Sequence, residues 1–463
     1  MKCLLHLLTI LVLLTNCTFG AETSRPNVIL MLADDLGYGE PGCYGNPHGR
    51  TPRIDRLAAQ GVRFTNAYAA FNVCSPSRAA LLTGRYTHRL GPVFEDYFGA
   101  RCPGLDPKRD VTLGQMARDA GYATACFGKW NVSHNKTKGH TSPNAFGFDS
   151  WVGLHLNHNY YSHRLERGGE LDLYRDGEPW DSPGVWSDTI FADEAIRFIG
   201  ENRQRPFFIY LGWQAPHAPF QDPNEPNAAV IPGHKAENRT IVEKMIARLD
   251  LEIGRVLDSV EHHGLTQKTV VVLTSDNGGA LNISRNAPLR GWKQELWEGG
   301  IRVPLIVLYP GHIPVGRTVD SPVIHMDLTA TIAGIMGAKA PPQSPFDGVD
   351  LMPLLSGTRI DLGDRSLFWR RQIAKGAGLP SIRQSSVRRG DWTYIRSYRD
   401  VGDSDANVPR KDYDEELFNL KQDVGQTANR VIDEPERLAE LRSALDGWEK
   451  EMAVDAAQAA RAE

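Results

Sequence analysis

Cysteine is scarce in this sequence, and neither sign of charge is in large excess. The 463 residues include six cysteines, and 52 Lys and Arg residues against 56 Asp and Glu residues leave a net charge of −4. This balance does not indicate nucleic-acid binding, which is typical of strongly basic chains. After the first 20 residues, no apolar run is long enough to cross a bilayer. The 41% of hydrophobic residues predict an ordinary folded protein with one large domain and a smaller one.

Residues 1–20 have the layout of a secretory signal peptide. Lys2 precedes an apolar core from Leu4 to Leu14, and small and polar residues follow up to Gly20. We therefore expect a secreted or periplasmic protein with no transmembrane segment in the mature chain. Lipidation of Cys17 is the alternative way of processing this segment.

Two of the six cysteines fall in the signal segment. The four that remain are Cys43, Cys74, Cys102 and Cys126. Counting alone favours two disulfides in an oxidising compartment. The neighbours of Cys74 argue against that interpretation, and the pairing of the other three stays open.

Short apolar runs alternate with helical patterns along the chain. Four runs are typical of strands buried on both faces, namely 27–33, 122–128, 207–213 and 269–275. Residues 112–121 and 240–263 have the spacing of helices. This alternation predicts an α/β fold with a large, mostly parallel sheet sandwiched by helices.

Polar residues follow these strands at the edge where sites form in open α/β sheets, beyond the carboxyl ends of the strands. Asp34 and Asp35 follow the first strand, and Asp276 and Asn277 follow the fourth. Each pair alone could form a turn. Together they offer three carboxylates and an amide oxygen, which suit Ca²⁺ or Mg²⁺ and suit zinc poorly.

Basic side chains occur at further positions along this edge. Lys129 follows the second strand, His217 lies in the sequence APHAP after the third, and Lys293 lies in LRGWKQELWEGG. Taken singly, each is explained as a surface lysine or a loop histidine. Clustered with an arginine near a divalent cation, they would bind a tetrahedral oxyanion.

The stretch NVCSPSRAALLTGRY, residues 72–86, predicts a helix with Pro76 in its first turn and Gly84 at its end. Cys74 then lies at the helix N-terminus, where free amides and the dipole favour negative charge. Arg78 lies about one turn further on and can reach back. These features predict an activated thiolate and nucleophilic catalysis. The alternative is an apolar helix with an incidental buried cysteine.

The sequence CSPSRAALLTGR in this stretch resembles the signature of the type I, formylglycine-dependent sulfatases, which are arylsulfatase-like members of the alkaline phosphatase superfamily. Further stretches of this sequence resemble other motifs of the family and occur in the same order, namely NVILMLADDLGYGEPGCYG, TPRIDRLAAQGVRFTNAY, GYATACFGKW, APHAP, VVLTSDNGG and LRGWKQELWEGGIRVP. The resemblance runs from about residue 26 to EELFNLKQDVGQTAN and covers nearly the whole mature chain.

The resemblance implies a modified nucleophile and a metal ion. A formylglycine-generating enzyme would oxidise Cys74 to formylglycine during maturation. One hydroxyl of the hydrated aldehyde would attack sulfur, and the other would expel sulfate afterwards. By the same resemblance, residue 74 would bind Ca²⁺, with Mg²⁺ as the alternative, together with Asp34, Asp35, Asp276 and Asn277.

The resemblance also implies roles for the basic residues. Arg78 would stabilise the ionised hydrate, and Lys129, His217 and Lys293 would contact the sulfate or the bridging oxygen. His217 or Lys293 would donate a proton to the leaving alcohol.

One position departs from the family pattern. The family commonly continues the lysine motif as GKWH, whereas this chain has GKWNVSH with Asn131 in place of the histidine. An amide can orient the hydrate but cannot act as a base, so sulfate release is slower, or His134 or another group takes over. We hypothesise that Asn131→His raises turnover.

We expect the catalytic domain to span residues 21–361, and the secondary-structure pattern changes in residues 362–463. Strand patterns at 366–371, 385–398 and 415–420 precede a helical pattern over 434–460. These patterns predict a smaller C-terminal domain of antiparallel sheet plus one helix, as in the family.

The loops at 86–108, 131–187 and 370–390 would line the pocket. The second is rich in aromatic and hydrogen-bonding residues (GLHLNHNYYSHR), which suit a sulfated carbohydrate, although an aryl sulfate also fits the family. The alternative is that these residues only tie down a long loop.

Two other functions are compatible with the expected site. One is a phosphodiesterase or phosphonate monoester hydrolase of the same superfamily. The other, if Cys74 stays unmodified, is a non-catalytic protein that binds sulfated glycans.

Overall fold

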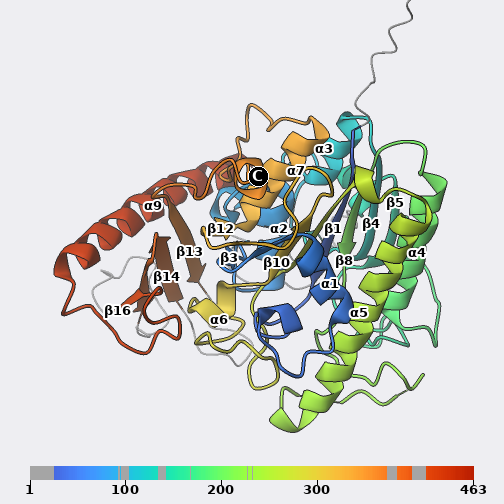
Figure 1. Ribbon diagram of the computed structural model, residues 1–463, viewed down its shortest axis with the longest axis horizontal. Helices are drawn as coiled ribbons and strands as arrows, with labels where there is room; N and C mark the ends of the chain where they lie inside the picture. Colours follow the sequence, from blue (N-terminus) through green and yellow to red (C-terminus); the bar gives the residue numbers. More distant parts are fainter. Residues whose placement is uncertain are drawn as a thin grey trace, which may run out of the picture.

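The structure is a computed structural model that describes residues 25–91, 94, 104–133, 142–166, 168–226, 228–231, 233–372, 383–398 and 413–462. The expected signal peptide, Cys17, Cys102 and His134 lie outside these residues. Two bodies are visible in Figure 1, a large α/β part and a smaller antiparallel sheet with a long helix.

A ten-stranded sheet runs through the large part. Its centre is formed by four parallel neighbours, β9 (Thr269–Ser275), β1 (Asn27–Ala33), β8 (Phe207–Gly212) and β4 (Ala123–Lys129). These are the four strands predicted from the sequence, and they confirm the mostly parallel sheet. Ala33 pairs with Ser275 and Leu32 with Gly212, so the strands end at a common edge.

Shorter strands extend the sheet on both sides. Beyond β9 lie β10 (Leu305–Leu308), β2 (Val62–Phe64) and β11 (Arg317–Val319), and β10 is antiparallel to both of its neighbours. Beyond β4 lie β5 (Ser150–Leu154), β6 (Tyr174–Arg175) and β7 (Glu178–Pro179). A separate parallel pair joins β3 (Ala67–Tyr68) to β12 (Val323–Ile324).

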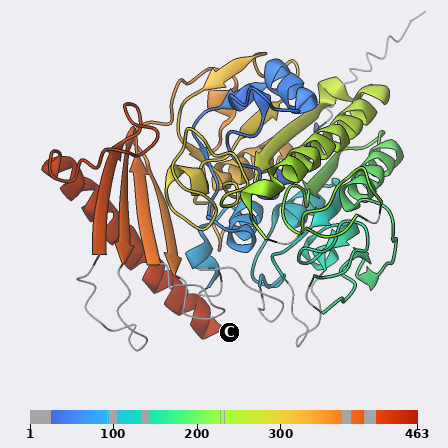
Figure 2. The same ribbon diagram turned by 90° about the horizontal axis from the view of Figure 1, so that it is seen from below.

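Helices cover both faces of the sheet (Figures 1 and 2). Ile29 and Met31 of β1 share a core with α1 (Pro52–Gln60), α4 (Ser187–Glu201) and α5 (Arg239–His262). Val28, Leu30 and Leu32 share the opposite core with α2 (Cys74–Thr83), α3 (Leu113–Asp119) and α7 (His325–Met336). Alternate side chains of a strand point to opposite faces, so a strand buried on both sides must be apolar throughout. The short helices α6 (Glu298–Ile301) and α8 (Met352–Leu355) complete this part.

The C-terminal part is an antiparallel sheet with one helix, as predicted. Its strands are β13 (Ser366–Gln372), β14 (Arg383–Arg389), β15 (Trp392–Tyr398) and β16 (Tyr413–Asn419), and the helix is α9 (Pro435–Ala462). Leu441 and Leu445 of α9 share one core with Tyr68 and Tyr86 of the large part. The domain boundary after residue 361 stays a prediction.

The described cysteines do not form disulfides. Cys43, Cys74 and Cys126 are free thiols, so a framework of two disulfides is wrong. Among the residues that the structure describes, no helix combines the length and the apolar character needed to cross a membrane.

The shared core predicts that α9 stabilises the fold by burial. Leu445 is fully buried, and Leu445→Ala is expected to lower the free energy of unfolding by about 2–5 kcal/mol, because a cavity replaces the lost contacts. Urea unfolding measures this change. The control is Val454→Ala in the same helix, whose side chain is exposed and which should change stability by about 0.5 kcal/mol or less. An equal loss of stability in the two variants would contradict the burial of Leu445 in the shared core.

Candidate active site

Four polar residues meet where β1 and β9 end. Asp34 and Asp35 follow β1, Asp276 and Asn277 follow β9, and all four are buried. The backbone amide of Asp35 donates to Oδ1 of Asp276 at 3.2 Å, and Nδ2 of Asn277 donates to Oδ1 of Asp35 at 2.7 Å. The parallel register of the two strands therefore brings these predicted ligands together.

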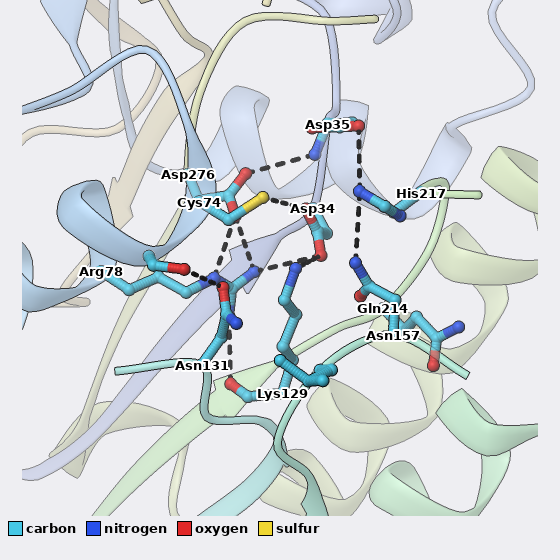
Figure 3. Close-up of polar contacts among 12 residues, drawn as sticks. Asp34, Asp35, Cys74, Arg78, Lys129, Asn131, Asn157, Gln214, His217 and Asp276 are labelled. Carbon is cyan, nitrogen blue, oxygen red and sulfur yellow. Dashed lines mark hydrogen bonds and ion pairs between the residues drawn. The ribbon is translucent and has the colours of Figure 1, made fainter. Parts of the chain in front are cut away.

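Cys74 is the first residue of α2, and its side chain points into this group (Figure 3). Its Sγ lies 3.4 Å from Oδ1 of Asp34 and 3.3 Å from Nζ of Lys293. Every residue of α2 is buried, and Gly84 ends the helix with a φ of 73°, a left-handed conformation that favours glycine. The predicted helix and the position of Cys74 at its N-terminus are confirmed.

Three cations are paired with the three carboxylates of the site. Arg78, one turn after Cys74, forms a two-pronged contact with Oδ2 of Asp276, at 2.9 Å from Nε and 2.8 Å from Nη2. Nζ of Lys129 lies 2.5 Å from Oδ2 of Asp34, and Nζ of Lys293 lies 2.7 Å from Oδ1 of Asp35. Burying a charge without a partner is costly, so this pairing allows the charged groups to be buried together.

The pKa values of two carboxyls in the site shift in opposite directions. Burial would raise the pKa of Asp34, but the positive charges around it, Lys129 foremost, together outweigh burial and hold this pKa well below its usual range. Burial, followed by repulsion from Asp34, raises the pKa of Asp276 to about 6. Asp34 is therefore kept charged more firmly than Asp276.

The activated thiolate expected at Cys74 is wrong for the unmodified residue. Burial, followed by the negative charge of Asp34, raises the pKa of the thiol to about 12. Lys129 and Lys293 lower it by less. A neutral thiol is a poor nucleophile. An unmodified Cys74 does not explain catalysis in this surrounding.

His217 lies at the open side of the site, with 18% of its side chain exposed. Its Nδ1 contacts the carbonyl oxygen of Ala218 at 2.5 Å, and its Nε2 lies 3.6 Å from Oδ2 of Asp35. Burial lowers the pKa of His217 to about 4. Lys293 is the opposite case, because burial would lower its pKa but the surrounding acidic groups, Asp35 foremost, together outweigh burial and raise this pKa well above the usual value. Of the two expected proton donors, Lys293 carries a proton at neutral pH.

The donor atoms fit a divalent cation. Asp34, Asp35, Cys74 and His217 place one potential ligand atom each within 4.8 Å of one another. Oδ1 of Asn277 is buried and has no hydrogen-bond partner among the described residues. A buried oxygen without a partner is costly, and a cation would satisfy it. The sequence predicted His217 near the cation as a contact to sulfate and did not count it among the ligands, whereas the structure places its ring nitrogen within reach of the same ion. Most of the donors are oxygens, which suit Ca²⁺ or Mg²⁺.

Asn131 is tied to the residue that follows Cys74. Its Oδ1 accepts from Oγ of Ser75 at 2.7 Å, and its Nδ2 donates to the carbonyl oxygen of His155 at 3.3 Å. Its backbone has a φ of 55°, which Asn tolerates better than most residues. The amide therefore links α2 to the segment after β5.

Most polar and aromatic residues of the sequence GLHLNHNYYSHR bond within the protein. His158 bonds to the carbonyl oxygen of Asp172 and to Ser187, and Tyr160 stacks on Trp186 and donates to the carbonyl oxygen of His217. His158, Tyr160 and His163 are completely buried. The interpretation that these residues line a sugar pocket is wrong for these three, and the alternative, that they tie down the loop, is confirmed. Asn157 differs, because its amide reaches His217.

Comparisons with known proteins agree on one family. A family model described as Sulfatase matches residues 26–338. N-acetylgalactosamine-6-sulfatase of Canis lupus familiaris is 31% identical over 421 residues, which cover 84% of this chain and 77% of that protein. Arylsulfatase A of Bos taurus is 30% identical over 453 residues, which cover 91% and 87%. The solved structure of Ps i-CgsB in complex with k-i-k-neocarrahexaose is similar with a TM-score of 0.78 at 28% identity, over 92% of this chain and 93% of that chain.

The family match includes β1, α2, β4, β8 and β9, whose ends carry the residues gathered around Cys74. The resemblance seen in the sequence is confirmed by the family model, by the relatives and by the fold. This chain belongs to the sulfatase family and is a sulfuric ester hydrolase.

Proposed function

We propose that this sulfatase removes sulfate from a carbohydrate, with formylglycine made from Cys74 as its nucleophile and Ca²⁺ as its metal. The observation that carries the proposal is the place of Cys74, whose Sγ is within 3.4 Å of both a carboxylate and an ammonium group. A carbohydrate substrate is supported by the names of two similar proteins, N-acetylgalactosamine-6-sulfatase and the complex with k-i-k-neocarrahexaose.

The hydrate of formylglycine would supply one hydroxyl for attack on sulfur with departure of the alcohol, and a second whose collapse to the aldehyde would release sulfate. Asp34, Asp35, Asp276 and Asn277 would hold Ca²⁺ beside it, and the ion would draw electron density from the sulfate oxygens.

The basic side chains act on the charge that develops around sulfur. Arg78 and Lys129 are oriented by Asp276 and Asp34, so their positive charges are in place before the substrate arrives. Lys293 lies closer to the open side, with 14% of its side chain exposed, where it can donate a proton to the bridging oxygen. His217 would contact the same oxygen or the sulfate.

Processing and location follow from the N-terminal sequence. Residues 1–20 direct export, so the mature enzyme is secreted or periplasmic, and a formylglycine-generating enzyme acts on it during maturation. Residues 21–361 form the catalytic domain and residues 362–463 the smaller domain. Lipidation of Cys17 is the alternative to release.

The nucleophile is tested on the tryptic peptide 64–78, which contains Cys74. In a host able to make formylglycine, we expect mass spectrometry to find an aldehyde or its hydrate in place of the thiol. Cys74→Ala should lower sulfate release by about 10³-fold or more, because the nucleophile is lost. Cys126→Ala, a buried cysteine outside the site, is the control. An unmodified Cys74 in an enzyme that still releases sulfate would refute the proposed nucleophile. An unmodified Cys74 with substrate bound but no sulfate released would favour a glycan-binding protein.

The metal is tested through Asn277, whose Oδ1 has no hydrogen-bond partner in the part of the chain that the structure describes. Chelation should abolish sulfate release, and added Ca²⁺ should restore it. Asn277→Ala should raise the Ca²⁺ concentration needed for half-maximal activity by about tenfold or more, because one ligand is lost. Asn224→Ala, at an exposed position, is the control. Unchanged Ca²⁺ dependence in Asn277→Ala would remove this residue from the ligand set.

The departure at Asn131 is tested by Asn131→His. We expect a severalfold higher kcat for sulfate release, because an imidazole can accept a proton where an amide cannot. Asn131→His also loses the contacts of Asn131 with Ser75 and His155. Asn131→Gln, which disturbs these contacts but keeps an amide, is the control for that loss. An unchanged or lower kcat in Asn131→His would contradict the hypothesis.

A further inference from the structure

The ring of His217 is held by two contacts, one on each nitrogen. Nδ1 faces the carbonyl oxygen of Ala218, and Nε2 lies 3.2 Å from Nδ2 of Asn157 (Figure 3). A carbonyl oxygen only accepts and an amide nitrogen only donates, so Nδ1 carries the hydrogen and Nε2 is the acceptor. Ala218 is the next residue in the chain, so among the described residues the hydrogen bond from Asn157 is the one that holds Nε2 from another segment, and Oδ2 of Asp35 lies further away at 3.6 Å.

The segment that carries Asn157 is fixed before and after this residue. The backbone amides of His155 and Leu156 donate to the carboxylate of Asp172, at 3.1 and 2.9 Å. The carbonyl oxygen of His158 accepts from Nε2 of Gln214 at 2.5 Å. Asn157 therefore projects from an anchored segment, and its amide has a defined position.

The same segment is bonded to the backbone around His217. The hydroxyl of Tyr160 donates to the carbonyl oxygen of His217 at 2.8 Å, and the backbone amide of Tyr160 donates to Oε1 of Gln221 at 2.7 Å. The backbone of His217 and the amide that faces its ring thus belong to one connected unit.

Only one end of the Asn157 side chain is satisfied. Its Oδ1 is buried and has no hydrogen-bond partner among the described residues. A buried amide oxygen without a partner is unfavourable, so local stability does not account for an asparagine at this position. The bond from its Nδ2 to His217 is the contact that accounts for an amide here.

We propose that Asn157 is a positioning residue for His217, holding Nε2 toward Asp35 and the reaction centre through the bond from Nδ2. The proposal rests on the proposed role of His217 in sulfate ester hydrolysis. Asn157 contributes to the rate through His217 and adds nothing when the imidazole is absent.

A double-mutant cycle with an aryl sulfate tests this dependence. Asn157→Ala should lower kcat by about tenfold or more in the wild-type enzyme and leave KM within about twofold, because a misplaced ring affects the chemical step. In a His217→Ala enzyme, the same substitution should have no further effect. Asn157→Asp, which keeps the volume and loses the donor, is made in parallel. Asn159→Ala, two residues further along the segment, is the control and should keep the wild-type kcat.

Equal losses in the two backgrounds would overturn the proposal, since Asn157 would then act independently of His217. An unchanged kcat in Asn157→Ala would overturn it as well. A crystal structure of Asn157→Ala supplies a readout without activity, and we expect a changed ring orientation at His217. An unchanged ring would refute the positioning role. A wild-type enzyme that releases no sulfate in the same assay would instead refute the proposed function.

Discussion

The ion pairs of Asp34 are the constraint on which the site depends. This carboxylate is completely buried, and a buried charge requires partners of opposite sign. Its partners come from different elements, Lys129 from the end of β4 and Arg78 from α2. Arg78 also binds Asp276 after β9. These ion pairs connect the ends of β1, β4 and β9 to helix α2. If one of these elements moved, a buried charge next to Cys74 would lose its partner.

The smaller C-terminal sheet also supports the site. The backbone amide of Lys293 donates to the carbonyl oxygen of Gly279, and the backbone amide of Gln294 donates to the carbonyl oxygen of Asn72. Oε1 of Gln384 in β14 accepts from the amide of Leu296. The segment that presents Lys293 is therefore bonded to loops of the large part at one end and to the small sheet at the other. This arrangement gives the C-terminal part a role in placing a residue of the site.

Much of the fold could be predicted because its strands are unusually apolar and end in recognisable polar residues. β1, β4, β8 and β9 appear in the sequence as continuous runs, since both faces of each strand are buried. The gathering of Asp34 and Asp276 follows from parallel strands ending at one edge. The loop between β5 and α4 was harder, because buried and exposed tyrosines or histidines look the same in a sequence. Tyr160 and His158 proved to bond internally.

By itself, the sequence determined the α/β class, the position of Cys74 at a helix N-terminus and the family to which the motifs belong. These features depend on local patterns that neighbouring residues define. Only the tertiary structure decided that the thiol of Cys74 has a raised pKa, that Oδ1 of Asn277 finds no partner among the described residues, and that Asn157 reaches His217. Burial, desolvation and contacts between distant segments arise only when the chain has packed, because they depend on distances in space and not on separations along the sequence.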